Sequence, residues 1–116
     1  MGEVTIIGDR MAGKSYMLVA LAEKLMRRGF KVLYVAADMN VARERLYNVA
    51  ETADFDPRFK VYRGNGNEHV KDLRSDGAIY FSSARSNNRG LVVDTLILDD
   101  GVDSDLPAKY VYRATL

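Results

Sequence analysis

Residues 4–36 read VTIIGDRMAGKSYMLVALAEKLMRRGFKVLYVA, and this stretch decides the fold class of the chain. Its first four residues are an apolar, β-branched run closed by a glycine, which predicts a buried strand leading into a turn. From 14 to 28, apolar residues recur at the spacing of one helical face, and Gly29 supplies a left-handed stop. Residues 32–36 are continuously apolar, as in a parallel strand covered on both faces by helices. The stretch therefore predicts a β-α-β unit, whose helix buries Leu18, Leu21, Ala22 and Leu25.

The turn between this strand and this helix carries the most specific motif in the chain. Gly8-Asp9-Arg10-Met11-Ala12-Gly13-Lys14-Ser15 matches GxxxxGK[ST] at every fixed position, in the strand-loop-helix context that a phosphate loop requires. Its glycines let consecutive backbone N–H groups surround a phosphate, and the helix N-terminus adds a favourable dipole. We expect Lys14 to reach the β- and γ-phosphates and Ser15 to place its hydroxyl on Mg²⁺. Residues Gly8 to Tyr16 are thus the predicted nucleotide site, the alternative being a glycine-rich turn with an incidental lysine.

A second apolar run ends in two carboxylates, since residues 95–100 read TLILDD. A phosphate loop needs a metal-side acid at the end of a neighbouring strand, and we expect Asp99 to orient Mg²⁺ and its waters. The run resembles a Walker B motif, and this resemblance implies that Asp100 occupies the position where hydrolytic P-loop enzymes usually carry a glutamate that polarises water. Aspartate is one methylene shorter, and a base must lie within about 3 Å of the proton it takes, so we expect slow hydrolysis. The alternative is that both acids merely begin the acidic loop 99–105.

The rest of the chain alternates between strand and helix signals. Asn40 is predicted to cap a second helix that ends at Asp56-Pro57 and buries Leu46, Val49, Ala50 and Ala53. A brief helix is predicted over 68–73, after the turn-rich residues 64–67. Further strands are predicted at 59–63, 78–82, 95–98 and 109–114. This alternation implies one α/β domain over residues 1–116, a three-layer sandwich with a mostly parallel sheet.

Length and composition limit the classes of function. A chain of 116 residues with 47% hydrophobic content matches one ordinary globular domain. The absence of cysteine excludes disulfide frameworks, thiolate zinc sites and cysteine nucleophiles. With 17 Lys and Arg against 16 Asp and Glu, the net charge of +1 gives no bulk attraction to nucleic acid or to a membrane. No apolar run approaches the roughly 20 residues that span a bilayer, and the N-terminus lacks a secretory signal, so we expect an intracellular protein.

The segment between the phosphate-loop motif and the acidic run carries a further pattern of residues. Residues 80–90 read YFSSARSNNRG, and Asp94 follows before the acidic strand. This order resembles the ATPase lobe of phage terminase large subunits and the N-terminal lobes of related helicases. Residues 112–116 are similar to the coupling motif of those families, with Arg113 in place of its usual first serine. The resemblance implies an additional-strand P-loop ATPase with a minimal RecA-like core, which binds ATP and Mg²⁺ in DNA metabolism or packaging.

The same resemblance implies partners and a location. Terminases commonly carry a basic residue in the phosphate loop, which favours Arg10 as a nucleotide contact. Full motors also need an arginine from a second lobe or another subunit, so we expect a homo-oligomer or a partner subunit to supply one. Arg85, Arg89 and Arg113 are candidates in this chain, and solvated surface arginines are the alternative. The Arg85 and Arg89 loop could also contact DNA phosphates, and the expected location is the host cytoplasm if a phage encodes the chain.

Two other functions stay open. The short chain and Asp100 favour a nucleotide-binding accessory or switch protein without significant turnover. The sequence through Ser15 also looks like the opening of thymidine kinases, although those carry a glutamate after the metal-side aspartate and usually a cysteine-ligated zinc lobe. Among the other residues, we expect the lone histidine, His69, to be exposed and Tyr110 and Tyr112 to pack in the last strand.

Overall fold

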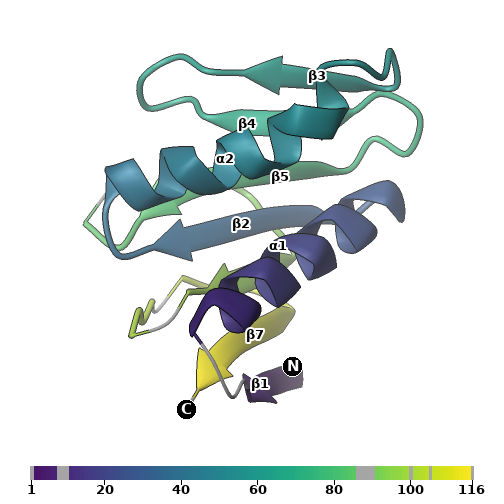
Figure 1. The fold of residues 1–116 in the computed structure, drawn as a ribbon. Coiled ribbons are helices and arrows are strands. Elements are labelled where there is room, and N and C mark those ends of the chain that lie inside the picture. Colours follow the sequence, from purple (N-terminus) through teal and green to yellow (C-terminus); the bar gives the residue numbers. More distant parts are fainter. Residues whose placement is uncertain (1, 8–10, 86–90, 100, 105, 116) are drawn as a thin grey trace.

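A seven-stranded sheet with two helices on one face organises the chain (Figure 1). The computed structural model describes the backbone at residues 2–7, 11–85, 91–99, 101–104 and 106–115, and side chains within 17–85, 91–99, 101–104 and 106–113. The elements in chain order are β1 (Gly2–Ile7), α1 (Met11–Arg27), β2 (Lys31–Ala36), α2 (Met39–Ala53), β3 (Phe59–Tyr62), β4 (His69–Asp72), β5 (Ala78–Ser83), β6 (Thr95–Leu98) and β7 (Tyr110–Thr115).

The strand order in the sheet is β1-β7-β6-β2-β5-β4-β3. The first five of these strands are mutually parallel, while β4 pairs antiparallel with both β5 and β3. The prediction of a mostly parallel sheet is therefore confirmed. The strands of the predicted β-α-β unit, β1 and β2, are not neighbours, because β7 and β6 lie between them. Local sequence could not reveal this insertion, since both inserted strands come from the last part of the chain.

The main core lies between the sheet and its two helices. Strand β2 contributes Val32, Tyr34 and Ala36 to this core, each fully buried. Both helices bury the faces that their periodicity predicted: in α1 Leu18 and Ala22 fully and Leu21 and Leu25 partly, and in α2 Leu46, Val49, Ala50 and Ala53. Val19, Met26 and Ala42 are buried as well. This α/β packing is the fold class expected from the sequence.

The opposite face of the sheet is covered by irregular segments instead of helices. Leu33, Val35, Leu96 and Leu98 form a second buried cluster with Val102. The partly buried residues packed on it include Leu91, Val93, Leu106 and Ala108, which lie in the connections on either side of β6. The third layer of the sandwich is thus built from loops in the described part of the chain. The apolar run of β2 is accordingly buried on both faces, but only one of those faces is covered by helices.

The end of α1 follows the geometry that Gly29 predicts. Gly29 has a φ of 93°, in the left-handed region. Its N–H donates to the carbonyl of Met26 at 3.0 Å, and the N–H of Phe30 donates to the carbonyl of Leu25 at 3.1 Å. These two bonds form a Schellman motif, which satisfies carbonyls that the helix itself leaves without partners.

The predicted cap of α2 and the predicted helix over 68–73 were both wrong. The second helix is capped by Asp38, whose carboxylate accepts a hydrogen bond from the N–H of Val41 at 2.9 Å, so Asn40 lies inside the first turn. Residues 69–72 form β4 instead of a helix. Val70 and Asp72 point to the helix side and are fully buried, while His69 and Lys71 alternate with them. Pairing with β3 and β5 outweighs the weak helical signal there.

Aromatic side chains that are far apart in the chain contact one another across the sheet. The His69 ring stacks between those of Tyr62 and Tyr80, with centroids 4.1 and 5.0 Å away, so the expectation of an exposed histidine was wrong. Tyr110 meets Phe30 edge to face at 6.1 Å, and Tyr112 packs against the main core. The packing role expected of the two C-terminal tyrosines is confirmed.

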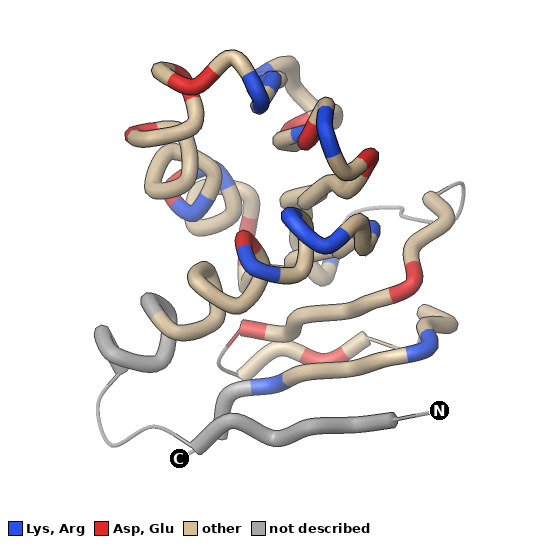
Figure 2. The backbone as a smooth tube through the Cα atoms, turned by 90° about the vertical axis from the view of Figure 1, so that its right-hand side faces the viewer, with Lys and Arg blue, Asp and Glu red and all other residues tan. Residues whose placement is uncertain are grey.

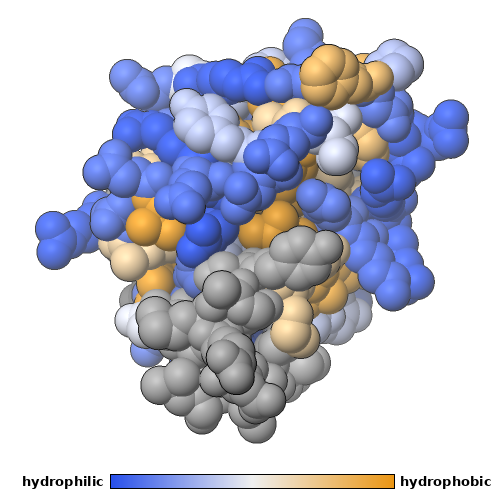
Figure 3. Space-filling model, in the orientation of Figure 1, coloured by the Kyte–Doolittle hydropathy of each residue, from blue (hydrophilic) through white to orange (hydrophobic). Residues whose placement is uncertain are grey.

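The described surface carries both signs of charge. Lys and Arg are interspersed with Asp and Glu along the backbone (Figure 2). The helix-bearing face is largely hydrophilic, with hydrophobic side chains in small separate areas (Figure 3). No helix in the described residues is long and apolar enough to cross a bilayer.

Asp72 is a fully buried carboxylate at the end of β4. Arg58 donates to both of its oxygens through Nε, at 2.9 and 3.0 Å, and the backbone N–H groups of Arg74 and Ser75 donate at 2.9 and 3.3 Å. Burial raises the pKa of Asp72, but these hydrogen bonds lower it by more, so it lies well below the ordinary value of 3.8.

We predict that this carboxylate makes the fold acid-sensitive. Because the folded pKa is depressed, its contribution to stability is fully present above the unfolded pKa of about 4 and is lost as the pH falls below it. Asp72→Asn should lower Tm at pH 7 by on the order of 10 °C and flatten its dependence on pH in the acid range. Thermal unfolding between pH 7 and about 2.5 measures both effects.

The exposed Asp76 offers a matched control in the same turn, with a side chain that is 81% exposed. Asp76→Asn should leave the acid dependence as it is in the wild type. An Asp72→Asn protein that loses stability in acid as steeply as the wild type would contradict the role assigned to this carboxylate.

Candidate functional site

The five parallel strands all end at one edge of the sheet, and the predicted site residues follow two of them. Thr5 of β1 and Leu98 of β6 both pair with Arg113 of β7, so the three strands are in register at this edge. Only β7 separates β1 from β6, which puts their axes about 10 Å apart at the usual strand spacing. Crevices at the carboxyl ends of parallel strands are where open α/β sheets bind ligands.

The phosphate-loop motif spans the junction of β1 and α1. Gly8, Asp9 and Arg10 lie outside the described residues. The backbone from Met11 to Tyr16 forms the first turns of α1, which begins three residues earlier than predicted and includes Ala12, Gly13, Lys14 and Ser15. The side chains of these helical residues are not among those described. What is observed is a strand that ends at Ile7 and a helix that begins at Met11.

Asp99 follows β6 directly and is 6% exposed. Its N–H donates to the carbonyl of Val35 at 3.0 Å, and its own carbonyl accepts from the N–H of Val102 at 3.1 Å. These two bonds fix the backbone that carries the carboxylate at the carboxyl edge. Asp100, the predicted base, lies outside the described residues.

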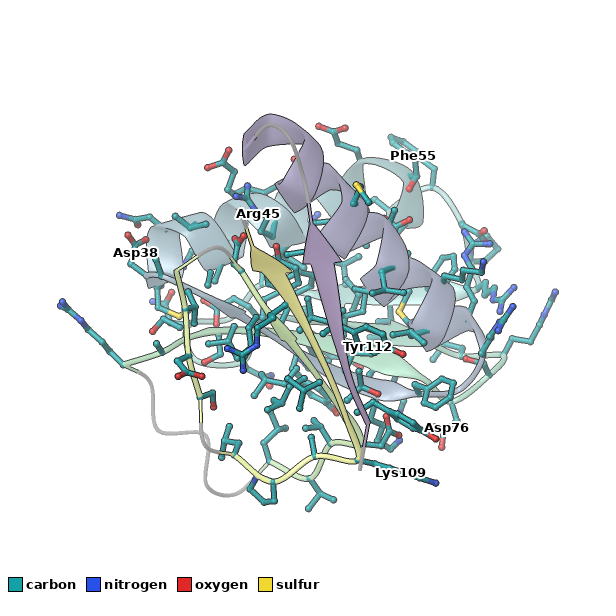
Figure 4. All side chains as sticks on the ribbon, turned by 90° about the horizontal axis from the view of Figure 1, so that it is seen from below. Asp38, Arg45, Phe55, Asp76, Lys109 and Tyr112 are labelled. Atoms are coloured by element: carbon teal, nitrogen blue, oxygen red, sulfur yellow. The ribbon has the colours of Figure 1, made fainter. Side chains whose placement is uncertain are left out.

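The side chain that contacts this carboxylate was not predicted from the sequence. Arg45 reaches Asp99 from α2, with Nε 3.4 Å from Oδ2. The Arg45 side chain is 16% exposed and that of Asp99 is 7% exposed, so the pair is largely shielded from water. Figure 4 shows Arg45 and Asp38 at the end of the sheet toward which β1 and β7 point, with Asp76 and Lys109 at the other end. A signal was present, since position 45 is one turn from the inward-facing Ala42 and Val49.

Tyr34 of β2 is fully buried and lies close enough to this ion pair to interact with both of its charges. Burial, and then the negative charge of Asp99, raise the pKa of Tyr34 far above its ordinary value, which keeps its hydroxyl neutral. Burial lowers the pKa of Arg45, but Asp99 and Tyr34 raise it by more, and the guanidinium remains charged. The site thus contains a charged pair and a neutral hydroxyl that interacts with it.

A second arginine anchors α2 on the neighbouring part of the sheet. Arg43 Nε lies 3.1 Å from Oε2 of Glu68, whose side chain is 1% exposed. Arg43 also donates to the side chain of Asn65 at 3.5 Å. The helix therefore carries two arginines, each paired with a buried carboxylate from a different part of the chain.

The arginines predicted to complete an active site are not gathered at Asp99 in the described residues. Arg85 is exposed after β5, and Arg89 lies outside the described part. Arg113 forms an ion pair with Asp103 at 3.6 Å. It shares a strand face with Val111, which packs on the loop-covered side of the sheet, whereas Arg45 approaches Asp99 from the helix side. The structure therefore brings Arg45, and not Arg113, to Asp99.

The buried carboxylate at this edge, Asp99, would suit a nucleotide-bound Mg²⁺. No group of three or more acidic or histidine side chains gathers within the described residues. Magnesium bound with a nucleotide does not need such a cage, since it keeps several waters and takes one or two carboxylates together with phosphates. A single buried carboxylate with a fixed backbone, as at Asp99, meets that requirement.

Comparison with solved structures identifies the fold. The chain aligns over 98% of its length with a mutant of the large terminase ATPase domain of Thermus phage P74-26, at a TM-score of 0.57 and 14% identity. A second structure of that ATPase domain aligns over 85% of the chain, at a TM-score of 0.53 and 17% identity. This chain has a terminase-like ATPase fold. This chain covers 59% and 47% of the length of those two solved chains, so it corresponds to only part of each.

Sequence comparison adds no relative to this structural likeness. No protein-family model matches the chain, and no curated protein sequence matches it. The terminase-like fold is consequently carried by the arrangement of strands and helices, at an identity too low to transfer residue roles.

Proposed function

We propose that this chain is a minimal P-loop ATPase of the terminase-like type, which binds ATP with Mg²⁺ and hydrolyses it slowly. The observation that carries the proposal is the GxxxxGK[ST] motif at the β1–α1 junction of a terminase-like ATPase fold. The buried Asp99 at the same sheet edge supports it. So does the strand order, because β7 is the additional strand between the phosphate-loop strand and the acidic strand.

In this proposal each residue has a defined task. Backbone N–H groups of the loop hold the phosphates, and Lys14 balances the charge on the β- and γ-phosphates. Ser15 and Asp99 would hold Mg²⁺, which would supply positive charge beside the phosphate oxygens. Asp100 takes a proton from the attacking water, and its short side chain makes this step slow.

DNA and a second subunit enter the proposal as partners. Arg85 is exposed in the described residues and would contact DNA phosphates together with Arg89. An arginine from another protomer or a partner subunit would stabilise the transition state, which in related reactions accelerates phosphoryl transfer by about 10³–10⁵. The net charge of +1 limits the DNA contribution to this local loop.

A nucleotide-gated accessory protein is the second candidate function. The observation that favours it is the Arg45–Asp99 ion pair, which occupies the predicted metal-side acid. Such a protein would bind nucleotide and change its surface without significant turnover. A thymidine-kinase-like activity ranks below both, because the chain has Asp100 where those enzymes carry a glutamate and has no cysteine for a zinc lobe.

Steady-state phosphate release from ATP with Mg²⁺, measured with and without DNA, tests the proposal. We expect slow release that requires Mg²⁺ and rises when DNA is added. Nucleotide binding without release would favour the accessory protein, and thermal protection by thymidine would favour the kinase. A chain that neither binds nor hydrolyses ATP would contradict the proposal.

A further inference from the structure

We propose that Arg45 and the divalent cation compete for the carboxylate of Asp99, so that Arg45 sets the Mg²⁺ concentration that the nucleotide complex requires. The inference rests on the proposed ATP and Mg²⁺ site and adds a positioning residue and a form of regulation to it. It makes α2 the element that responds to the arrival of the metal.

The ion pair between Arg45 and Asp99 is buried. With side chains only 16% and 7% exposed, Arg45 and Asp99 have exchanged most of their hydration for each other. Removing one partner of such a pair leaves the other charge buried without compensation. In the absence of metal, Arg45 is therefore the buried counter-charge of the Asp99 carboxylate.

The positive charges of Arg45 and of a bound Mg²⁺ would repel each other. An arginine side chain does not give up its proton in proteins, so the positive charge stays beside Asp99 whatever the nucleotide state. Magnesium binds oxygen ligands at about 2.0–2.1 Å, which would bring a double positive charge within a few ångströms of the Arg45 guanidinium. Nε already lies 3.4 Å from Oδ2. Two cations at one carboxylate are unfavourable, so each weakens the hold of the other.

Metal binding and the contact between Arg45 and Asp99 affect each other reciprocally. If Arg45 weakens metal binding, metal binding must weaken the attachment of Arg45 to Asp99 by the same factor. Arg45 is part of α2, which also contacts the sheet through the Arg43–Glu68 pair. Loading the site with metal and nucleotide should thus loosen α2 near Arg45 while Arg43 keeps its partner.

The main experiment is a titration of MgCl₂ in the presence of a fluorescent ATP analogue, with binding as the readout. Arg45→Gln should lower the half-saturating Mg²⁺ concentration by about tenfold, a coupling in the usual range for linked sites. Arg45→Lys retains the charge and should stay within about threefold of the wild type. When Asp99→Asn is also present, adding Arg45→Gln should no longer change the Mg²⁺ requirement.

Arg43→Gln is the matched control. It removes an arginine two positions away on the same helix, and that arginine pairs with Glu68 instead of Asp99. General loosening of α2 would therefore affect both variants, whereas competition for Asp99 affects only Arg45→Gln. An unchanged or raised Mg²⁺ requirement in Arg45→Gln would overturn the proposal.

Hydrogen–deuterium exchange on the wild-type chain gives a readout that does not depend on a variant folding. Peptides covering Arg45 in α2 should exchange faster with Mg²⁺ and nucleotide than with nucleotide and a chelator, and equal or slower exchange would overturn the proposal. Wild-type nucleotide binding that does not require Lys14 would contradict the proposed function and this inference together. Binding that requires Lys14 and Asp99 but is insensitive to Arg45 would contradict this inference alone.

Discussion

Lys14→Ala should lower the rate of phosphate release from ATP by about 10²-fold or more, because one preorganised cationic contact to the developing charge has an effect of this size in comparable enzymes. The lysine follows the last glycine of the motif, at the start of α1. Without its charge, the loop retains only backbone N–H groups to balance the β- and γ-phosphates. Steady-state release with Mg²⁺ measures the loss, and equilibrium binding of ATP should weaken in parallel.

Lys24→Ala is the matched control, since Lys24 is an exposed lysine in the last turn of the same helix. It should release phosphate at the wild-type rate. If Lys14→Ala binds ATP as tightly as the wild type, the phosphate-loop assignment is wrong. If Asp100→Ala retains full turnover, the assignment of the catalytic base fails while the binding site stands.

Gly77→Ala should destabilise the fold by about 3 kcal/mol or more, because the added methyl group meets backbone that cannot move aside. A Cβ at this position would lie 2.0 Å from the carbonyl oxygen of Met26 and 3.0 Å from that of Phe30. Those carbonyls belong to the end of α1 and the turn that follows it. The glycine therefore allows β5 to begin directly against the end of α1.

The hydrogen bonds around Gly77 prevent an easy adjustment. Its N–H donates to Oγ of Ser75 at 3.0 Å, and its carbonyl accepts from the N–H of Asp72 at 2.8 Å. Oγ of Ser75 in turn donates to the carbonyl of Met26 at 2.7 Å. Moving Gly77 away from α1 would break bonds on both sides of the turn, so the clash converts into lost stability.

Urea unfolding at equilibrium measures this effect. A domain of ordinary stability has about 5–15 kcal/mol in total, so Gly77→Ala should show a markedly lower midpoint or populate the unfolded state without denaturant. Gly64→Ala is the control, because a Cβ there meets nothing within 4 Å, and it should stay within about 0.5 kcal/mol of the wild type. A Gly77→Ala midpoint equal to that of Gly64→Ala would show that the contact with α1 is easily relieved.

Much of the fold was predictable because its signals are local. The apolar stripes of α1 and α2, the stop at Gly29 and most strands follow from side-chain periodicity and backbone preference over a few residues. Prediction failed locally at the cap of α2, which Asp38 and not Asn40 supplies, and it failed again where partners on other strands decide the outcome. Residues 69–72 become a strand because β3 and β5 flank them, and His69 is covered because Tyr62 and Tyr80 are its neighbours in those strands.

Some features of the candidate site were likewise predictable from the local sequence, and others were not. The phosphate-loop motif and the acidic end of β6 were predictable from the amino-acid sequence, since each is defined by residue types at fixed spacing. Three features became visible only in the folded chain: β7 lies between these two motifs, loops cover the second face of the sheet, and Arg45 pairs with Asp99. Those features arise from strand pairing and from charges buried together, and both are contacts between residues far apart in the chain, which local sequence patterns do not encode.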